Sequence, residues 1–242
     1  MIKIENVEVL GWKHVIRGMR NPKNSWDRMD SFFWEHGSGF EEAWGLEETV
    51  RENVTSTSYH IGPNDHKLMM QLASGGPVHA KYRRMIIVYL DITAPLYWWK
   101  EFDTYKVGTV ANSCSTMHKI HDKEFTLDDF SHEHLHVRGL KRLVDDTHEL
   151  NFWRNTYLNG GVVDNEDGTS VNLYDPKSKD AWWQMIQLLP SSYNQKRTIM
   201  LNYEVLVGIY TWRKNHKLDE WRTFCEWIES LPYSELIIGE KL

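Results

Sequence analysis

Cysteine is scarce in this chain of 242 residues, and long apolar runs are missing. The two cysteines, Cys114 and Cys225, have no paired spacing, which excludes a disulfide framework and a cysteine zinc site and predicts free thiols. Apolar stretches stay well below the roughly 20 residues of a membrane span, and residues 1–6 lack the apolar core of a signal peptide. We therefore expect a cytoplasmic protein with no membrane partner.

Positive charge is also in short supply. The 28 Lys and Arg residues are outnumbered by 34 Asp and Glu residues, the formal net charge is −6, and the basic residues form no long run. Proteins that bind a nucleic-acid backbone concentrate basic residues on one face or in one segment. The expected partner is therefore a small molecule or another protein, and not a nucleic acid.

Aromatic residues are abundant. They make up 13% of the chain, within a hydrophobic content of 41%, and 12 of them are tryptophan. A chain of this length can bury one sizeable core, and we expect a single domain over residues 1–242. Tryptophan pairs at Trp98-Trp99 and Trp182-Trp183 suit the core and contacts between subunits, because each ring buries a large area.

Periodicity and helix-ending residues predict the elements. No internal repeat or low-complexity segment interrupts them. Asn64 is predicted to cap a helix that stops at residues 75–77, and Pro95 to stand in the first turn of a helix. The predicted strands cover residues 2–10 and 85–92, a hairpin covers 162–174, and helices cover 12–19, 64–74, 140–157, 181–189, 197–215 and 218–231. This pattern indicates an α+β fold.

The stretch from Thr93 to Thr116 resembles the centre of the flavin-dependent thymidylate synthases. In that family an Ala-Pro pair leads a helix, followed by Arg-His-Arg and, seven residues later, a serine. With Ala94-Pro95 placed on the pair, Thr104-Tyr105-Lys106 stand at Arg-His-Arg and Cys114 stands at the serine, between Ser113 and Ser115. We call residues 104–106 the signature segment.

Matches on both sides extend the resemblance over most of the chain. Upstream, His79 stands at a family histidine near the flavin. Downstream, a second block has the family's spacing at Leu189-Pro190, Asn202, Leu206 and Arg213. If residues 197–215 are helical, Asn202 and Arg213 lie on one helix face about 16 Å apart, at about 1.5 Å per residue.

The resemblance implies an α+β fold like that of the family, with helices packed on a mixed or antiparallel sheet. It implies methylation of dUMP at C5, or a related one-carbon transfer to a pyrimidine deoxynucleotide. Such an enzyme would use FAD reduced by NADPH, with a folate as the one-carbon donor, in a homotetramer whose sites form between subunits. The candidate catalytic residues are Cys114, Ser113 and Ser115. The candidate cofactor-binding residues are His79, Tyr105, Lys106 and Asn202, and the candidate substrate-binding residues are Arg213 and Lys106.

Each candidate has a plainer interpretation. Arg213 also suits the C-terminal end of a surface helix, where it favours the helix dipole. Tyr105 and Lys106 also fit an ordinary helix end, although Lys106 keeps one charge of the signature without the fork of an arginine. Cys114 also fits a small buried hydrophobe. A catalytically silent homologue that binds a nucleotide or a protein is therefore the alternative function, and the altered signature segment favours it.

A histidine-rich stretch stands outside the resemblance. The alternation in His132-Glu133-His134-Leu135-His136 can present imidazoles to a metal on a strand-like face, or it can be a solvated loop. No flanking motif supports a metal, so no metal site is predicted.

Overall fold

A computed structural model describes residues 2–35, 57–164 and 171–239 of the chain. The contacts divide it into two compact units, each made from several segments. Unit 1 comprises residues 1–3, 92–104 and 112–197, and unit 2 comprises 4–91, 105–111 and 198–242. The expectation of a single domain stays a prediction.

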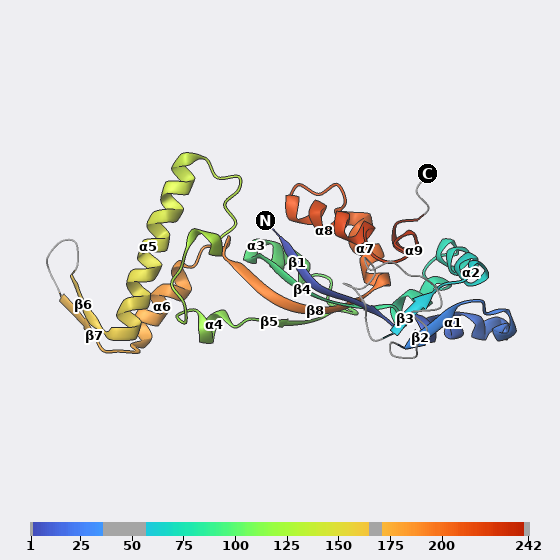
Figure 1. The fold of residues 1–242 in the computed structure, drawn as a ribbon. Coiled ribbons are helices and arrows are strands. Elements are labelled where there is room, and N and C mark those ends of the chain that lie inside the picture. The colour runs from blue at the N-terminus through green and yellow to red at the C-terminus, as the bar shows by residue number, and fades with distance from the viewer. Residues whose placement is uncertain (1, 36–56, 165–170, 240–242) are drawn as a thin grey trace, which may run out of the picture. The chain divides into compact units, whose positions relative to one another are not determined.

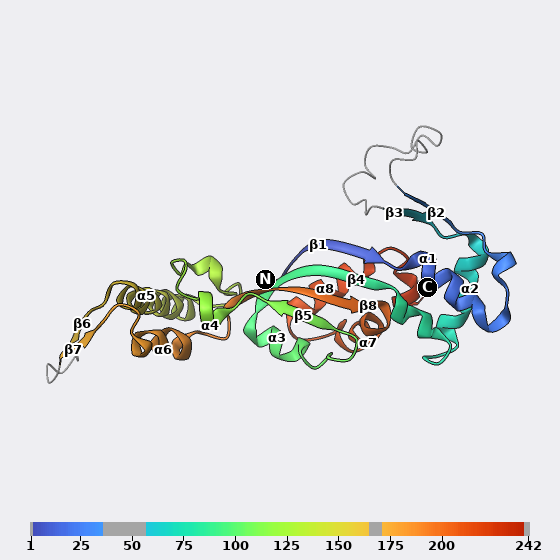
Figure 2. The same ribbon diagram turned by 90° about the horizontal axis from the view of Figure 1, so that it is seen from below.

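The largest sheet has four strands in the order β1-β4-β8-β5, and neighbouring strands are antiparallel (Figure 2). Two further pairs, β2 with β3 and β6 with β7, are antiparallel hairpins. The strands are β1 Lys3–Leu10, β2 Phe32–Glu35, β3 Thr57–His60, β4 Ile87–Pro95, β5 Val110–Ser113, β6 Gly161–Asp164, β7 Val171–Tyr174 and β8 Asn194–Asn202.

Helices account for most of the remaining described chain (Figure 1). The α-helices are α1 Trp12–Arg20, α2 Pro63–Ser74, α3 Leu96–Phe102, α4 Thr116–Lys119, α5 Val137–Asn159, α6 Lys179–Leu188, α7 Tyr203–Arg213, α8 Asp219–Glu229 and α9 Glu235–Ile238. Short 3-10 helices cover Asn21–Lys23, Trp26–Arg28, Ala80–Met85 and Leu127–Asp129. The α+β class predicted from the sequence is confirmed.

In unit 2, helices α7, α8 and α9 lie on one side of the strands (Figure 1). The alternation of β4 explains this arrangement, because Val88 and Leu90 are buried while Tyr89 is exposed. The helices complete the core with Leu206, Ile209, Phe224 and Ile228, all without exposed surface. Burying such side chains is worth about 1.5–3 kcal/mol each.

In unit 1, the long helix α5 packs against α6, and the hairpin of β6 and β7 follows α5 (Figure 1). Gly160 ends α5 with φ of 72°, close to the predicted end of this helix at residue 157. The second core of the chain forms here from Ile120, Phe125, Phe130, Leu143, Leu150, Trp153, Ala181 and Met185. The predicted turn of the hairpin falls on residues 165–170, outside the described residues.

Three local predictions are wrong. Residues 197–202 belong to strand β8 and not to a helix, because Ile199 and Leu201 alternate with more exposed residues and only Tyr203 begins α7. Asn64 lies inside α2, whose N-cap is Gly62. Pro95 is the last residue of β4 and the N-cap of α3, with an extended backbone (φ −68°, ψ 151°), so the helix begins one residue later, at Leu96.

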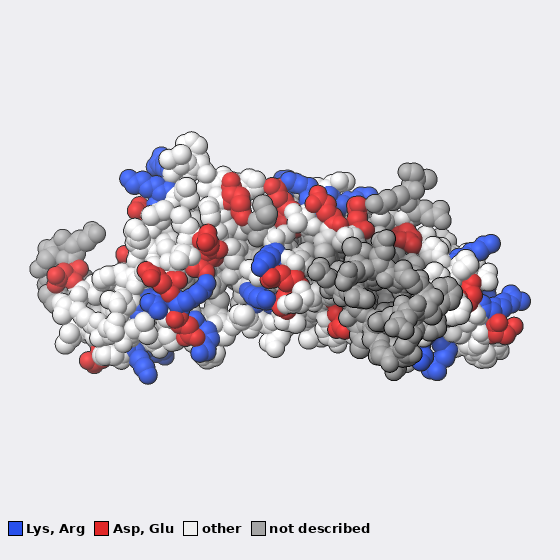
Figure 3. All heavy atoms as spheres, in the orientation of Figure 1, with Lys and Arg blue, Asp and Glu red and all other residues white. Residues whose placement is uncertain are grey.

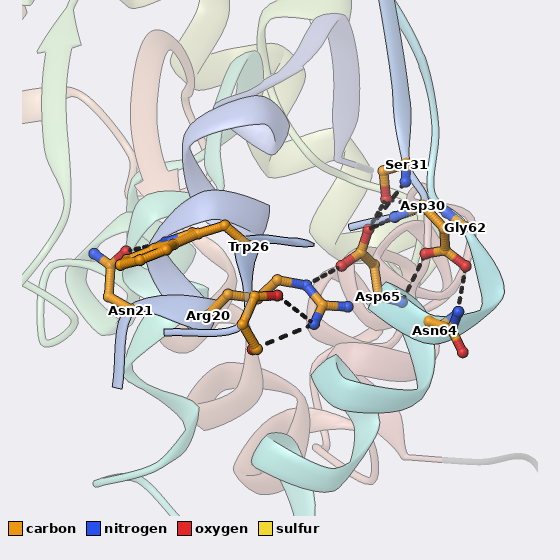
Figure 4. A network of polar contacts seen from close by, with 9 residues as sticks. Arg20, Asn21, Trp26, Asp30, Ser31, Gly62, Asn64 and Asp65 are labelled. Carbon is orange, nitrogen blue, oxygen red and sulfur yellow. Dashed lines mark hydrogen bonds and ion pairs between the residues drawn. The ribbon is translucent and has the colours of Figure 1, made fainter. Parts of the chain in front are cut away.

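A buried polar network ties the segment after α1 to the start of α2 (Figure 4). Asp65 accepts hydrogen bonds from Arg20 Nε at 2.6 Å, from Ser31 Oγ at 2.7 Å and from the backbone N–H groups of Asp30 and Ser31 at 3.0 Å. The Asp30 carboxylate accepts from the N–H groups of Asn64 and Asp65 at 2.8 and 3.0 Å. Asp30 therefore caps α2, the role predicted for Asn64.

On the face shown in Figure 3, described Lys and Arg side chains are interspersed with Asp and Glu. No helix in the described part of the chain is both long and apolar enough to span a bilayer.

Candidate functional site

The segment 105–111 runs beside helix α7 in unit 2, and it meets that helix near both ends. Near the C-terminal end of α7, Arg213 Nε donates a hydrogen bond to the Tyr105 hydroxyl over 3.0 Å. Near the N-terminal end, Gly108 lies against Asn202 and Val205. The structure therefore brings Tyr105 of the signature segment together with the second family block.

Gly108 makes the contact near the N-terminal end of α7 possible. Its φ is +80°, a value that favours glycine, and a Cβ at this position would lie 3.0 Å from Asn202 Nδ2 and 3.2 Å from Val205 Cγ2. Asn202 is the buried N-cap of α7, and its side-chain oxygen accepts a hydrogen bond from the N–H of Val205 at 3.1 Å. Asn202 thus holds the helix start while its amide nitrogen faces the segment.

Arg213 is held on several sides. Its guanidinium lies over the Trp221 ring at 4.8 Å from the centroid and over the Tyr105 ring at 5.7 Å. Nη1 lies 3.0 Å from His216 Nε2, and the Tyr105 and Trp221 rings meet edge to face at 5.9 Å. These contacts set Arg213 apart from an ordinary surface arginine, because two rings and the hydroxyl fix its orientation.

Lys106 and His79 are exposed side chains of unit 2. Neither the Lys106 ammonium nor the His79 imidazole makes a hydrogen bond or ion pair with another residue in the described part of the chain. His79 precedes the 3-10 helix Ala80–Met85, and its ring packs over Gly75 at the end of α2. Both side chains therefore offer polar groups to a ligand.

The three catalytic candidates belong to unit 1. Ser113 ends β5, Cys114 follows it, and Ser115 caps α4 by accepting a hydrogen bond from the N–H of His118 at 3.1 Å. All three residues are exposed, which contradicts the plainer interpretation of Cys114 as a buried hydrophobe. The Cys114 backbone N–H donates to the Lys196 carbonyl at 2.9 Å, so strand β8 fixes the position of this residue.

A constrained arginine of unit 1 escaped the sequence analysis. Arg197 on β8 lies over the Trp99 ring at 4.2 Å, donates from Nη1 to Asp103 at 2.8 Å and donates from Nε to Gln195 at 2.9 Å. Gln195 in turn donates to the Cys114 carbonyl at 3.0 Å. Asp103 immediately precedes the signature segment in the sequence, so the Arg197 guanidinium contacts the residue next to that segment. These contacts join residues far apart in the sequence, so no local spacing indicated them.

The histidine-rich stretch forms the turn before α5. His132 Nδ1 lies 2.8 Å from the Phe130 carbonyl, and His134 and His136 are exposed. Within residues 2–35, 57–164 and 171–239, no group of three or more His, Cys, Asp or Glu side chains is arranged to hold a metal ion. The loop interpretation matches this geometry.

Comparison with solved structures places this fold among known proteins. Thymidylate synthase X (ThyX) of Helicobacter pylori, a flavin-dependent thymidylate synthase crystallised with FAD and dUMP, aligns with a TM-score of 0.60 and 12% identity over 99% of this chain and 98% of its own. The UMP/dUMP methylase PolB of Streptomyces cacaoi, bound to 5-Br dUMP, aligns with a TM-score of 0.54 and 10% identity over 95% of this chain and 88% of its own.

No protein-family model matches the sequence, and no curated protein matches it. At 10–12% identity the alignments establish the fold alone. The chain therefore has the fold of the flavin-dependent thymidylate synthases, as its sequence resemblance predicted.

Proposed function

We propose that this protein binds a pyrimidine deoxynucleotide such as dUMP and modifies it with bound FAD, by C5 methylation or a related one-carbon transfer. The observation that carries the proposal is the contact between Tyr105 and Arg213, which joins the signature segment to the second family block. The fold shared with proteins crystallised with FAD and dUMP supports it.

Arg213 is the proposed nucleotide-binding residue. A guanidinium fork matches a phosphate or a pyrimidine carbonyl, and the rings of Tyr105 and Trp221 hold it in place before a ligand arrives. Lys106 adds one exposed positive charge for a phosphate, without the bidentate geometry of an arginine. Cys114, flanked by Ser113 and Ser115, is the proposed catalytic side chain.

The polar groups of unit 2 suit a flavin nucleotide at the residues that the resemblance names. The Lys106 ammonium and the His79 imidazole are exposed and have no partner among the described residues, so they are free to donate to phosphate or ring atoms. Asn202 presents its amide nitrogen toward the segment that carries Lys106. When bound, FAD would supply redox chemistry, with NADPH as reductant and a folate as the proposed one-carbon donor.

One observation favours the alternative, a catalytically silent homologue that binds a nucleotide or a protein. The signature segment keeps a single positive charge, and Tyr105 uses its hydroxyl to accept from Arg213. Visible absorption distinguishes the two functions, because bound FAD is yellow. Protein that stays colourless after incubation with FAD and gel filtration, yet binds dUMP, would identify the silent homologue.

Calorimetry with dUMP tests the nucleotide site directly. We expect Arg213→Ala to weaken binding by about 1–3 kcal/mol through loss of a charge-assisted contact. The matched control is Arg17→Ala, which removes an exposed arginine of α1 in the same unit. Equal affinity of both variants for dUMP, with circular dichroism unchanged, would show that Arg213 does not bind the nucleotide.

The proposed assembly is a homotetramer. Exposed apolar side chains of unit 2, including Val107 at 92% and Trp212 at 78% exposure, flank Lys106 and Arg213 in sequence and suit a subunit contact. Light scattering should give four times the 28.7 kDa chain mass. A mass near one chain at micromolar concentration would refute the assembly and sites shared between subunits.

A further inference from the structure

A cavity of about 650 Å³ opens in unit 2 beside α2, the 3-10 helix Ala80–Met85 and α9. Its size lies within the roughly 300–1,000 Å³ of small-molecule sites. The polar side chains in its lining are His66, Lys67, Gln71, Ser74, Arg83 and Glu235. None of the residues assigned a role in the proposed function belongs to this lining.

Arg83 is a buried cation whose hydrogen bonding is incomplete. The residue is 9% exposed, and its Nε atom is buried without a hydrogen-bond acceptor among the described residues. Its Nη1 forms an ion pair with Glu204 Oε2 at 3.7 Å, beyond hydrogen-bond reach, and that oxygen has no hydrogen-bond partner in the described chain. A buried guanidinium with incomplete hydrogen bonding costs free energy, and Arg83 lines the cavity, so a ligand oxygen that accepts from its guanidinium would stabilise it.

The other charges of the lining leave the cavity receptive to an anion. Glu235 is engaged, because its Oε1 lies 2.7 Å from His66 Nε2. Lys67 is exposed and makes no ion pair with a described residue. A guanidinium fork and an ammonium therefore share a cavity whose carboxylate already has a partner. This pairing suits a phosphate, whose several oxygens can accept from both cations.

We propose that this cavity binds the phosphate group of a small molecule, with Arg83 supplying a fork of donors and Lys67 a point charge. Gln71 and Ser74 provide further polar groups in the lining. The site is separate from the nucleotide site proposed at Arg213, and it does not depend on the proposed function.

Isothermal titration with inorganic phosphate at constant ionic strength tests the site. Wild-type protein should show one saturable site. We expect Lys67→Ala to weaken it about tenfold, the effect of losing one charge-assisted contact. Lys81→Ala is the matched control, because Lys81 is an exposed lysine two residues from Arg83 and does not line the cavity. Arg83→Lys keeps the charge without the fork and should lose at least as much affinity.

Two results would overturn the proposal. One is the absence of saturable binding, or equal weakening by Lys67→Ala and Lys81→Ala, which would reflect general charge alone. The other is binding that survives Lys67→Ala but disappears in Arg213→Ala, which would place the phosphate in the proposed nucleotide site. If Arg83→Lys fails to fold by circular dichroism, the comparison of the exposed lysines still decides.

Discussion

Replacing Asp65 with asparagine should strongly destabilise unit 2. The Asp65 side chain has no exposed surface, and its carboxylate accepts four hydrogen bonds, one of them from the Arg20 guanidinium (Figure 4). Asparagine keeps one acceptor oxygen and turns an NH₂ group toward the remaining donors. It also leaves the charge of Arg20, whose side chain is 4% exposed, buried without its partner.

The expected loss follows from the burial of this pair. Removing one partner of a buried ion pair costs about 3–5 kcal/mol, whereas the same change at an exposed carboxylate costs about 0.5 kcal/mol or less. Asp27→Asn is the matched control, since Asp27 is exposed and lies in the same segment, between Arg20 and Ser31. Urea unfolding of both variants measures the difference.

The pH dependence gives a second readout of the same contact. Burial alone would raise the pKa of Asp65, but hydrogen bonds from Ser31, the Asp30 backbone and Arg20, with the Arg20 charge, lower the pKa overall. Asp65 therefore stabilises the fold fully above the unfolded pKa near 3.9 and loses this contribution as pH falls through the lower folded pKa. Asp65→Asn should flatten the acid limb of the stability curve. An unchanged acid limb, or a destabilisation equal to that of Asp27→Asn, would refute the reasoning.

Two further predictions concern the candidate site. Gly108→Ala should destabilise the protein by about 1–3 kcal/mol, and by more than the control Gly76→Ala. Both glycines have positive φ, but only at Gly108 would an added Cβ press against Asn202 and Val205. Equal shifts in the thermal midpoint of the two variants would show that this contact is not tight. A thiol reagent near neutral pH should label Cys114 alone, because Cys114 is exposed while burial raises the pKa of Cys225 to about 12. Labelling of a thiol in the folded Cys114→Ser variant would contradict this.

The sequence predicted most elements because their apolar periods are clear. It failed at residues 197–202, where the alternation of Ile199 and Leu201 runs directly into the helical spacing of Leu206 and Ile209. Asn202 marks the change, since its side chain caps α7. A polar residue able to cap a helix, at the point where the apolar period changes from two to nearly four, was the available signal.

The candidate site was likewise predicted only in part from the sequence. The family spacing identified Tyr105 and Arg213 separately, and the structure joins them. Trp221 and the stack of Arg197 on Trp99 could not be predicted, because these contacts join residues far apart in sequence and leave no local period. Spacing along a helix finds neighbours within one element, whereas packing between elements decides which ring lies under which guanidinium.

Because unit 2 is built from three separated segments, it cannot form before residues 198–242 have been synthesised. Strands β1 and β4 of unit 2 emerge early, but Leu206, Ile209, Phe224 and Ile228, which complete its core, lie in the last segment, 198–242. Contacts of such long sequence separation slow folding and leave apolar strand surface exposed in the meantime. Truncation from the C-terminus should therefore abolish unit 2 as a whole, and production of this protein should respond to chaperones and to slower synthesis.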